Sequence, residues 1–458
     1  MGIYGALATA VSGLQAQAFA LENISGNIAN SQTTAYKRTE TDFVNLIAEA
    51  SQRRQKGGSV QAYSVATNNL RGDMTASTSP TNMALNGTGY FVVDQKVGIN
   101  DGNALFGGTN YYTRRGDFQV DSGGYLVNGA GYYLKGLPID ATTGNVSGSV
   151  PSVVRIDNAF LPASATTSID YKLNVPQVPQ TLSYDANTAN SELLVVADYA
   201  NDPTTAGTGV VTGADDATFL SQSISGGAIT VYSSSGAPVN VQMRWAKTAN
   251  TATTGTDTWN LFYLTDSTAT GAATKWKNVG QSYTFAADGS LSPAVTKTTI
   301  SAASVDGVSL GDLTLQHGSA GVTQFDDANG TAQVTRLAQN GFAAGSFVSV
   351  TINNSGRVVA AYSNGETVEL AQIVTANFNA VNQLKKLDGG IFASTSESGE
   401  AIIDSDGGGI QGATLEASNT DISEEFTKLI VTQQAYAAGT RIVTSSDKML
   451  QEALNMVR

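Results

Sequence analysis

The C-terminal residues 415–458 carry an apolar side chain at every seventh position, and this repeat most constrains how the chain can fold. A seven-residue period places these side chains on one face of an α-helix, and a second apolar position four residues later completes a coiled-coil seam. Asp421 can cap this helix, with Glu424 three residues on as in a capping box. A lone helix cannot bury such a seam, so we expect a partner. The predicted seam consists of Ile422, Leu429, Tyr436, Val443, Leu450 and Val457, with Phe426 and Leu454 at the second position.

The N-terminal residues 1–30 offer that partner, because apolar residues follow there mostly in steps of three and four. Glu22 is the only charged side chain before Lys37. An exposed helix normally carries charges, so this one is expected to lie against neighbours or to face a confined space. Its glycines each cost about 1 kcal/mol relative to Ala, so the segment should be helical only when packed. The predicted seam of this helix consists of Tyr4, Leu7, Val11, Leu14, Ala18, Leu21 and Ile28.

Composition points to β structure between the two helices. The 48 glycines, with abundant Thr, Ser and Val, are typical of short strands and tight turns, and 458 residues suggest roughly three domains. A net charge of −13 argues against a nucleic-acid or anionic-membrane partner. The sequence has no Cys and only one His, His317, which excludes thiolate metal sites and makes zinc or Ser–His chemistry improbable.

Strand patterns occur in a central block of the sequence and in a second set of segments that flank it. Val239, Val241 and Met243 alternate with polar residues, as in a half-buried strand, and similar patterns flank this region on both sides. We therefore expect a multidomain, mainly β protein with two nested β domains, in which paired N- and C-terminal helices form a coiled-coil-like inner domain. The predicted segments are 1–30 with 421–458 for the helical domain, 31–70 with 401–420 for a linking region, 71–139 with 339–400 for the inner β domain, and 140–338 for an inserted outer β domain.

The N-terminus does not read as a targeting segment. Residues 1–21 are uncharged but lack a basic n-region, and Thr9, Ser12, Gln15 and Gln17 interrupt the apolar run. We expect neither a cleaved signal peptide nor a membrane-spanning helix.

Several motifs at both ends of the chain, taken together and in this order, resemble the bacterial flagellar rod and hook protein family. They are the run from Asn27 to Asn30, the pair Tyr36–Lys37, the glycine-aromatic segment at 87–93, the run 112–118, the turn at 362–365 and the run 415–421. Ala35 stands where the family usually has Gly. The motif residues carried over by this resemblance are Asn27, Asn30, Tyr36, Lys37, Gly89, Phe91, Asn364, Gly365, Asn419 and Asp421.

The long insertion between the two halves of the inner β domain is similar to the hook branch of that family. This resemblance implies a structural subunit that polymerises into a curved, flexible tube, a universal joint that transmits torque between rod and filament. It also implies export through the flagellar type III apparatus without a cleaved signal, and assembly beneath a hook cap between a distal rod protein and a hook–filament junction protein. The alternatives are a distal rod-like axial protein and a secreted β-rich adhesin.

The sequence offers few candidates for a catalytic or metal-binding site. The pairs Asp215–Asp216 and Asp326–Asp327 are neighbours in sequence, and adjacent acids usually mark a solvated surface. The run 404–409 lacks the spaced ligands of a calcium-binding EF-hand loop, and His317 has no companion ligand. We therefore expect no enzymatic activity, no cofactor and no metal.

Overall fold

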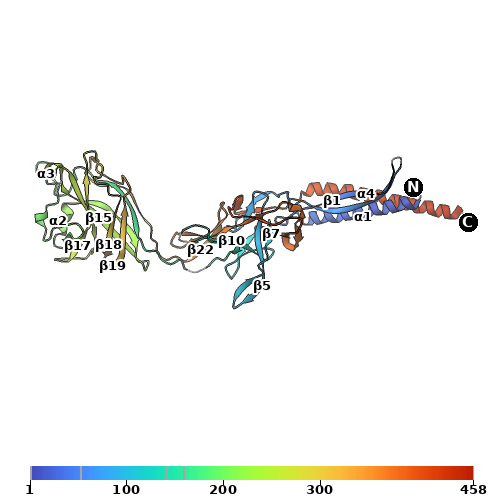
Figure 1. The fold of residues 1–458 in the computed structure, drawn as a ribbon, viewed down its shortest axis with the longest axis horizontal. Helices are drawn as coiled ribbons and strands as arrows, with labels where there is room; N and C mark the ends of the chain where they lie inside the picture. The colour runs from blue at the N-terminus through green and yellow to red at the C-terminus, as the bar shows by residue number, and fades with distance from the viewer. Residues whose placement is uncertain (1–2, 52–53, 141–142, 158–159, 457–458) are drawn as a thin grey trace. The chain divides into compact units, whose positions relative to one another are not determined.

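The computed structural model describes residues 3–51, 54–140, 143–157 and 160–456 (Figure 1). Within it the chain forms two compact units. The first comprises Met1–Asn158, Val348–Ala361 and Thr367–Arg458, and the second comprises Ala159–Phe347 with Tyr362–Glu366. Both ends of the chain thus belong to one unit, and most of the middle forms the other.

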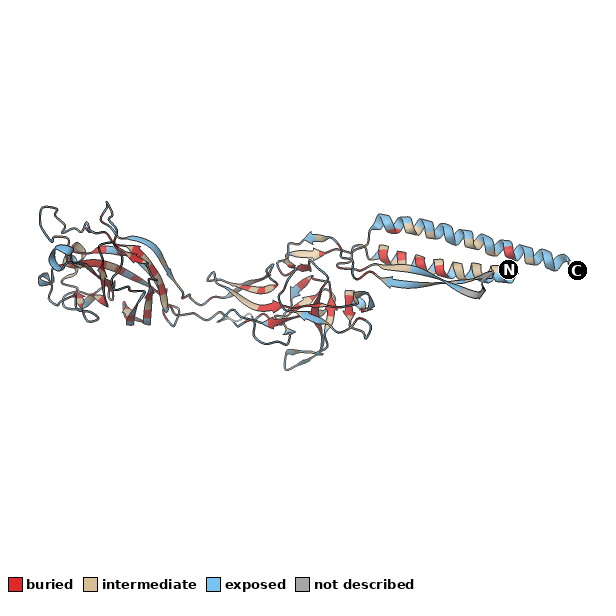
Figure 2. Cartoon of the chain, turned by 45° about the horizontal axis from the view of Figure 1, so that its top comes forward, coloured by how far each residue is buried: buried red, intermediate tan, exposed pale blue. Residues whose placement is uncertain are grey.

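The terminal helices are α1 (Ile3–Ala29) and α4 (Ile422–Met456), and they pack against each other, as predicted (Figure 1). Gly439 on α4 allows this close approach, because a Cβ there would lie 2.9 Å from Leu14 Cδ2. α4 stays exposed along most of its length, whereas α1 carries a row of buried residues (Figure 2). No helix within the described ranges is long and apolar enough to cross a membrane.

The second partner of α1 is a long antiparallel hairpin, β1 (Thr39–Ser51) with β2 (Arg54–Ala66), in which Thr39 pairs with Ala66. This hairpin occupies most of the predicted linking region 31–70. The side chain of Asn23 on α1 donates to Thr41 Oγ1 at 2.8 Å and to Ser64 Oγ at 3.1 Å, so α1 is bonded to both strands.

The inner β domain contains one large sheet in the order β22–β23–β24–β10–β5–β7–β27–β26, with short strands at its sides, and two two-stranded sheets, β29–β4 and β3–β30. Its core contains Val92 and four aromatic residues, Tyr90, Tyr112, Phe378 and Phe392. The ring of Tyr90 meets those of Phe378 and Phe392 edge to face, and Tyr112 meets Phe378 in the same way. The strands of this domain are β3 (Met74–Ala76), β4 (Met83–Leu85), β5 (Tyr90–Asn100), β6 (Asn103–Phe106), β7 (Tyr111–Thr113), β8 (Phe118–Val120), β9 (Leu126–Asn128), β10 (Tyr132–Pro138), β11 (Ser152–Val153), β22 (Phe347–Ile352), β23 (Arg357–Tyr362), β24 (Thr367–Ile373), β25 (Thr375–Asn377), β26 (Lys385–Leu387), β27 (Ile391–Ala393), β28 (Ile402–Asp404), β29 (Ile410–Gly412) and β30 (Thr414–Glu416), with short 3₁₀ helices η2 (Val381–Gln383) and η3 (Asp388–Gly390).

The second unit packs two sheets over a core rich in aromatic residues. One sheet has the order β13–β17–β16–β15–β14, and the other has the order β18–β19–β12–β20 with β21 beside β12. Trp245, Trp259, Tyr171 and Tyr283 are buried in its core. Its elements are β12 (Ser168–Asn174), η1 (Val196–Asp198), β13 (Val210–Thr212), α2 (Asp216–Ser221), β14 (Ile224–Tyr232), β15 (Pro238–Ala249), α3 (Thr251–Thr254), β16 (Asp257–Leu264), β17 (Thr274–Phe285), β18 (Lys297–Val305), β19 (Val308–Gln316), β20 (Val322–Thr323) and β21 (Gln333–Gln339).

The expected fold class, mainly β with paired terminal helices, is confirmed. The second unit begins later in the chain than the predicted boundary at residue 140. The reason is that β11 folds back onto the inner sheet, where Val153 pairs with Lys135 of β10.

Candidate functional site

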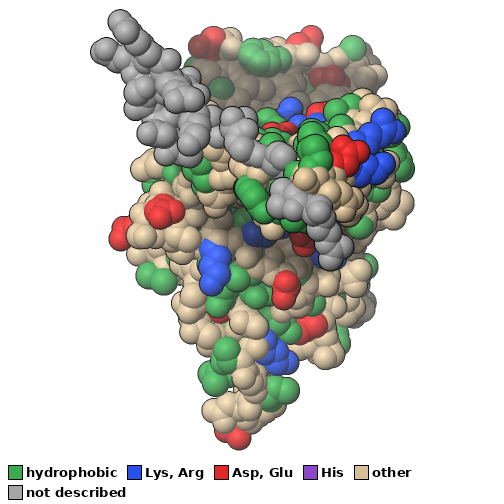
Figure 3. Space-filling model, turned by 90° about the vertical axis from the view of Figure 1, so that its right-hand side faces the viewer, with side chains coloured by type: hydrophobic (Ala, Val, Ile, Leu, Met, Phe, Trp, Pro, Cys, Tyr) green, Lys and Arg blue, Asp and Glu red, His purple; other side chains and the backbone are tan. Residues whose placement is uncertain are grey.

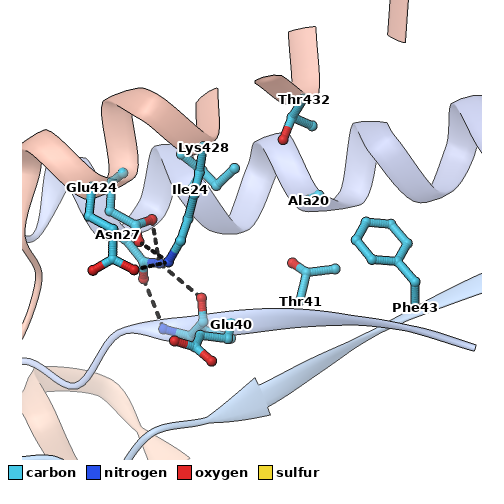
Figure 4. A pocket seen from close by; sticks show the side chains of 11 residues that line it. Ala20, Ile24, Asn27, Glu40, Thr41, Phe43, Glu424, Lys428 and Thr432 are labelled. Carbon is cyan, nitrogen blue, oxygen red and sulfur yellow. Dashed lines mark hydrogen bonds and ion pairs between the residues drawn. The ribbon is translucent and has the colours of Figure 1, made fainter. Parts of the chain in front are cut away.

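Motif residues from the two ends of the chain meet where α1 ends and α4 begins, and we call this region the junction. Asn27 is fully buried there and bonds in three directions (Figure 4). Its amide nitrogen donates to Thr39 O at 2.9 Å and to Glu425 Oε2 at 3.0 Å, and its Oδ1 accepts from Thr39 N at 2.9 Å. One side chain therefore ties α1 to both β1 and α4.

Tyr36 and Lys37 follow α1 and lie in the same place. The Tyr36 hydroxyl donates to Asn27 Oδ1 at 3.3 Å, and Lys386 Nζ lies 4.2 Å from the centre of its ring. Burial, with a contribution from the charge of Glu425, raises the pKa of Tyr36. Tyr36 thus stays neutral and serves as a hydrogen-bond donor.

Lys37 belongs to a buried ionic triad with Glu416 of β30 and Arg114 of the inner β domain. Lys37 Nζ lies 2.5 Å from Glu416 Oε1, and Arg114 Nη1 lies 3.2 Å from Glu416 Oε2. Lys37 also donates to Leu70 O at 2.7 Å. Burial lowers the pKa of Lys37, opposed by its bond to Glu416. Because all three side chains are buried, the triad joins the helical part to the β domain only while its charges remain paired.

The backbone around the triad restricts which residues fit at two positions, 72 and 35. Gly72 N donates to Glu416 Oε1 at 2.9 Å, and a Cβ at Gly72 would lie 2.0 Å from Ala417 O, so no other residue fits there. Ala35 has φ of 54°, in the left-handed region, and its N–H donates to Glu416 O at 2.8 Å. The flagellar rod and hook protein family, which the sequence resembles, usually has Gly at this position, and an Ala with a left-handed φ is strained.

Asn419 and Asp421 complete the junction from the C-terminal side. Asn419 Oδ1 accepts from Arg38 N at 2.7 Å, and its Nδ2 donates to Leu70 O at 3.2 Å. Asp421 Oδ1 accepts from Ser423 N at 2.8 Å and from Glu424 N at 3.2 Å, which confirms the predicted helix cap.

Glu424, expected to complete a capping box, instead pairs with Lys428 at 2.9 Å and with Arg38 at 2.8 Å. Its bonds to Lys428 and then Arg38 lower the pKa of this carboxyl. It therefore adds a second charged link between α4 and the segment after α1.

The other motif residues lie elsewhere. Asn30 closes the end of α1, donating to Gly26 O at 2.9 Å. Gly89 and Phe91 belong to the inner β domain, where Phe91 packs edge to face on Phe118. Asn364 and Gly365 form the predicted turn between β23 and β24, and Gly365 has φ of 86°.

An open groove of about 370 Å³ runs beside the junction between α1, β1 and α4 (Figure 4). Ala20 and Ile24 of α1 lie on one side and Phe43 of β1 on another, while Glu424 and Lys428 line it from α4. Its lining is part apolar and part charged, as suits packing against another polypeptide.

The predicted seam residues are only partly covered in the single chain. On α4, Leu429, Val443 and Leu450 are half-buried, whereas Phe426 and Leu454 of the second seam position are exposed. Ile422 and Tyr436 are also exposed, and Val457 lies outside the described residues.

On α1, Leu7, Leu14, Leu21 and Ile28 are half-buried, while Tyr4, Val11 and Ala18 are exposed. The fully buried row of α1 is instead Ala16, Ala20, Ile24 and Asn27. Ala20, Ile24 and Asn27 lie beside residues of β1 and α4. The spacing of four, four and three in this row was the signal that could have revealed it.

Sequence reasoning also missed Arg114, Glu416 and Glu425 as site residues. Arg114 and Glu416 lie inside motifs that were recognised, but nothing local in the sequence shows that they are buried and meet Lys37.

Asp215, Asp216 and His317 lie outside the junction and form structural bonds. Asp215 accepts from Thr212 Oγ1 at 2.8 Å, and Asp216 pairs with Lys275 at 2.9 Å. His317 is fully buried after β19, with Nδ1 2.9 Å from Tyr171 O and Nε2 3.1 Å from Tyr283 Oη. Within the ranges that the structure describes, no cluster of three or more His, Asp or Glu side chains could hold a metal ion.

Family models match the chain in order from end to end. Residues 7–37 match "Flagella basal body rod protein", and residues 411–456 match "Flagellar basal body rod FlgEFG protein C-terminal". Residues 84–182 match "Flagellar hook protein FlgE/F/G D1 domain", and residues 200–342 match "Flagellar basal body protein FlaE D2 domain". The two terminal matches contain the motif residues of the junction.

Relatives named flagellar hook protein FlgE align over nearly the full chain. The protein of Brucella suis is 29% identical over 475 residues, covering 100% of both chains. That of Escherichia coli K12 is 26% identical over 460 residues, covering 98% of this chain and 100% of the relative. The crystal structure of the Helicobacter pylori flagellar hook protein FlgE2 aligns with a TM-score of 0.50 at 15% identity, covering 76% of this chain and 99% of that one, which shows a similar fold.

Proposed function

The chain belongs to the bacterial flagellar hook protein family and is a structural subunit of the hook, and we propose that it polymerises into a curved, flexible tube through its terminal helices. In this proposal α1 and α4 of many copies pack around the tube axis. The predicted seam residues then become buried against neighbouring copies. The tube acts as a universal joint that transmits torque from rod to filament.

One observation carries this proposal. Both chain ends meet in one helical part, yet apolar residues of both helices stay exposed: Tyr4 and Val11 on α1, and Phe426 and Leu454 on α4. A monomer gains nothing from such exposure, because apolar surface in water is unfavourable. Contacts with further copies remove it.

The junction has a mechanical part in this proposal. Torque must pass between the helices and the β domains, and buried, paired charges resist displacement more than a solvated linker does. The helices and the inner β domain are therefore held together as one rigid body. The holding contacts are the triad of Lys37, Glu416 and Arg114 and the bonds of Asn27 and Asn419.

The proposed partners are those of a hook subunit: other copies of the chain, a distal rod protein, a hook–filament junction protein and a hook cap. We propose export through the flagellar type III apparatus with α1 retained, since removal of α1 would take Asn27 out of the junction. A solely structural role without catalysis is supported by the use of Asp215, Asp216 and His317 in structural bonds. On the face shown in Figure 3, described side chains of both charges are interspersed, which gives nucleic acid no basic patch.

Electron microscopy of polymer grown from purified full-length protein tests the proposal. We expect tubes that curve. Straight tubes would indicate a distal rod-like subunit instead, and folded protein that never polymerises would refute a hook subunit.

A further inference from the structure

A short hairpin of the inner β domain extends beyond its sheet. β5 continues past Asp94 and pairs with β6, Gly98 with Leu105 and Ile99 with Ala104, and Asp101 and Gly102 turn the chain with φ of 49° and 80°. We call residues 95–106 the β5–β6 arm, which projects from the domain (Figure 1). In the described part of the chain, β6 pairs with β5 alone, so its outer edge is free.

Three large apolar residues of the arm are exposed, beside polar ones. Val97 is 60% exposed, Ile99 67% and Leu105 53%. An isolated two-stranded hairpin is marginally stable in water. The register pairs Leu105 with Gly98 and Ile99 with Ala104, so exposed apolar side chains lie on both faces of the arm, and contact with another surface would remove them from water. Its free edge adds unpaired backbone groups that another strand could satisfy.

The base of the arm is held firmly. Phe106 packs edge to face on Tyr125, with ring centres 5.2 Å apart, and on Tyr133 at 5.1 Å. Beside them, Asp94 Oδ2 lies 3.4 Å from Lys135 Nζ, and both side chains are buried. The arm is therefore presented in a fixed direction, which lowers the entropy that docking costs.

We propose that the β5–β6 arm packs against a second copy of this chain and links neighbouring subunits of the polymer. This inference rests on the proposed function, since the neighbours in such a tube are copies of the chain. Charge favours the same occupant. The chain carries a net charge of −13 and repels its copies, whereas the arm has one Lys and one Asp and no net charge. An arm that docks on a different surface of the next copy also makes a contact that propagates along an open helical polymer.

The first test compares two variants of the purified full-length protein. In the arm variant, Ile99→Ser is combined with Leu105→Ser. In the control, Leu182→Ser changes a leucine that is 88% exposed on the second unit. We expect the arm variant to raise the critical concentration for polymerisation at least about tenfold, equivalent to about 1.4 kcal/mol. The control should match the original protein, and circular dichroism should show both monomers folded.

The second test does not depend on a destabilising change. The sequence has no Cys, so Ile99→Cys provides a single thiol for a benzophenone maleimide. Irradiation should give cross-linked dimers of the chain in polymer and none in dilute monomer.

The possible results separate the two proposals. Normal polymerisation of the arm variant, together with no dimer on irradiation of the labelled Ile99→Cys polymer, would overturn the role of the arm and leave the hook function standing. Failure of the original protein to polymerise would overturn both.

Discussion

Substitution Glu416→Gln tests whether the buried triad holds the first unit together. The change keeps the shape of the side chain but removes the charge that faces Lys37 at 2.5 Å and Arg114 at 3.2 Å. Removing one partner of a buried ion pair costs about 3–5 kcal/mol, because the remaining charge is left without compensation. Lys37, whose pKa burial already lowers, can release its proton, but Arg114 cannot. We therefore expect a loss of free energy of unfolding in that range.

The distribution of chromophores gives this experiment an internal control. The chain's three tryptophans, Trp245, Trp259 and Trp276, all lie in the second unit, whereas the long helices α1 and α4 lie in the first. In a urea titration, fluorescence follows the second unit and ellipticity at 222 nm follows mainly the first. With a slope of about 2 kcal/mol per molar urea, the ellipticity midpoint should fall by about 1.5–2.5 M while the fluorescence midpoint stays in place.

A matched variant, Glu369→Gln, removes one partner of the half-exposed pair with Arg357 in the same unit and should cost about 0–1 kcal/mol. Equal midpoint shifts for the two variants would refute the reasoning, since burial would then make no difference to the cost. So would a shift of the fluorescence transition alone.

Three further outcomes are expected. Burial lowers the pKa of His317, so below the unfolded value of about 6.5 the unfolded chain binds a proton that the folded chain does not. The stability of the second unit should then fall by up to about 1.4 kcal/mol per pH unit on acidification, and His317→Gln should abolish this slope in fluorescence titrations; an unchanged slope contradicts the assignment. Ala35→Gly should relieve left-handed strain and raise the stability of the first unit by about 1 kcal/mol, and a loss of stability would show that no strain is present. Leu450→Asp should place a charge in the helix seam and prevent polymerisation of a folded monomer, whereas the exposed control Gln451→Asp should polymerise; sedimentation distinguishes them.

Features with a local cause were predictable from the sequence. The seven-residue repeat specifies the C-terminal helix, Asp421 caps it, and the Asn364–Gly365 pair supplies the positive φ that its turn requires. The pairing of the two ends followed from the need of each seam for cover.

The ionic triad was not predictable, because its members are far apart in sequence and charged residues usually face solvent. Lys37 and Glu416 are separated by 379 positions, and only the fold reveals that both are buried. Sequence patterns identify a lysine and a glutamate in separate motifs but carry no sign that they meet.

The β1–β2 hairpin was missed for a different reason. Its strands pack against α1, whose buried row contains the small side chains of Ala16 and Ala20, and these add no conspicuous apolar stripe to the helix. The prediction therefore followed the larger residues, Leu7, Leu14 and Leu21, and assigned the hairpin to a linking region.

Hydrogen exchange measured on monomer and on polymer tests the central claim most directly, namely that the joined terminal helices build the tube. Peptides from α1 and α4 that contain exposed apolar residues, such as Val11 and Phe426, should gain protection on polymerisation. The core strands of the second unit, already buried, should change little. Equal exchange of both helices in monomer and polymer, with new protection confined to the second unit, would contradict the account.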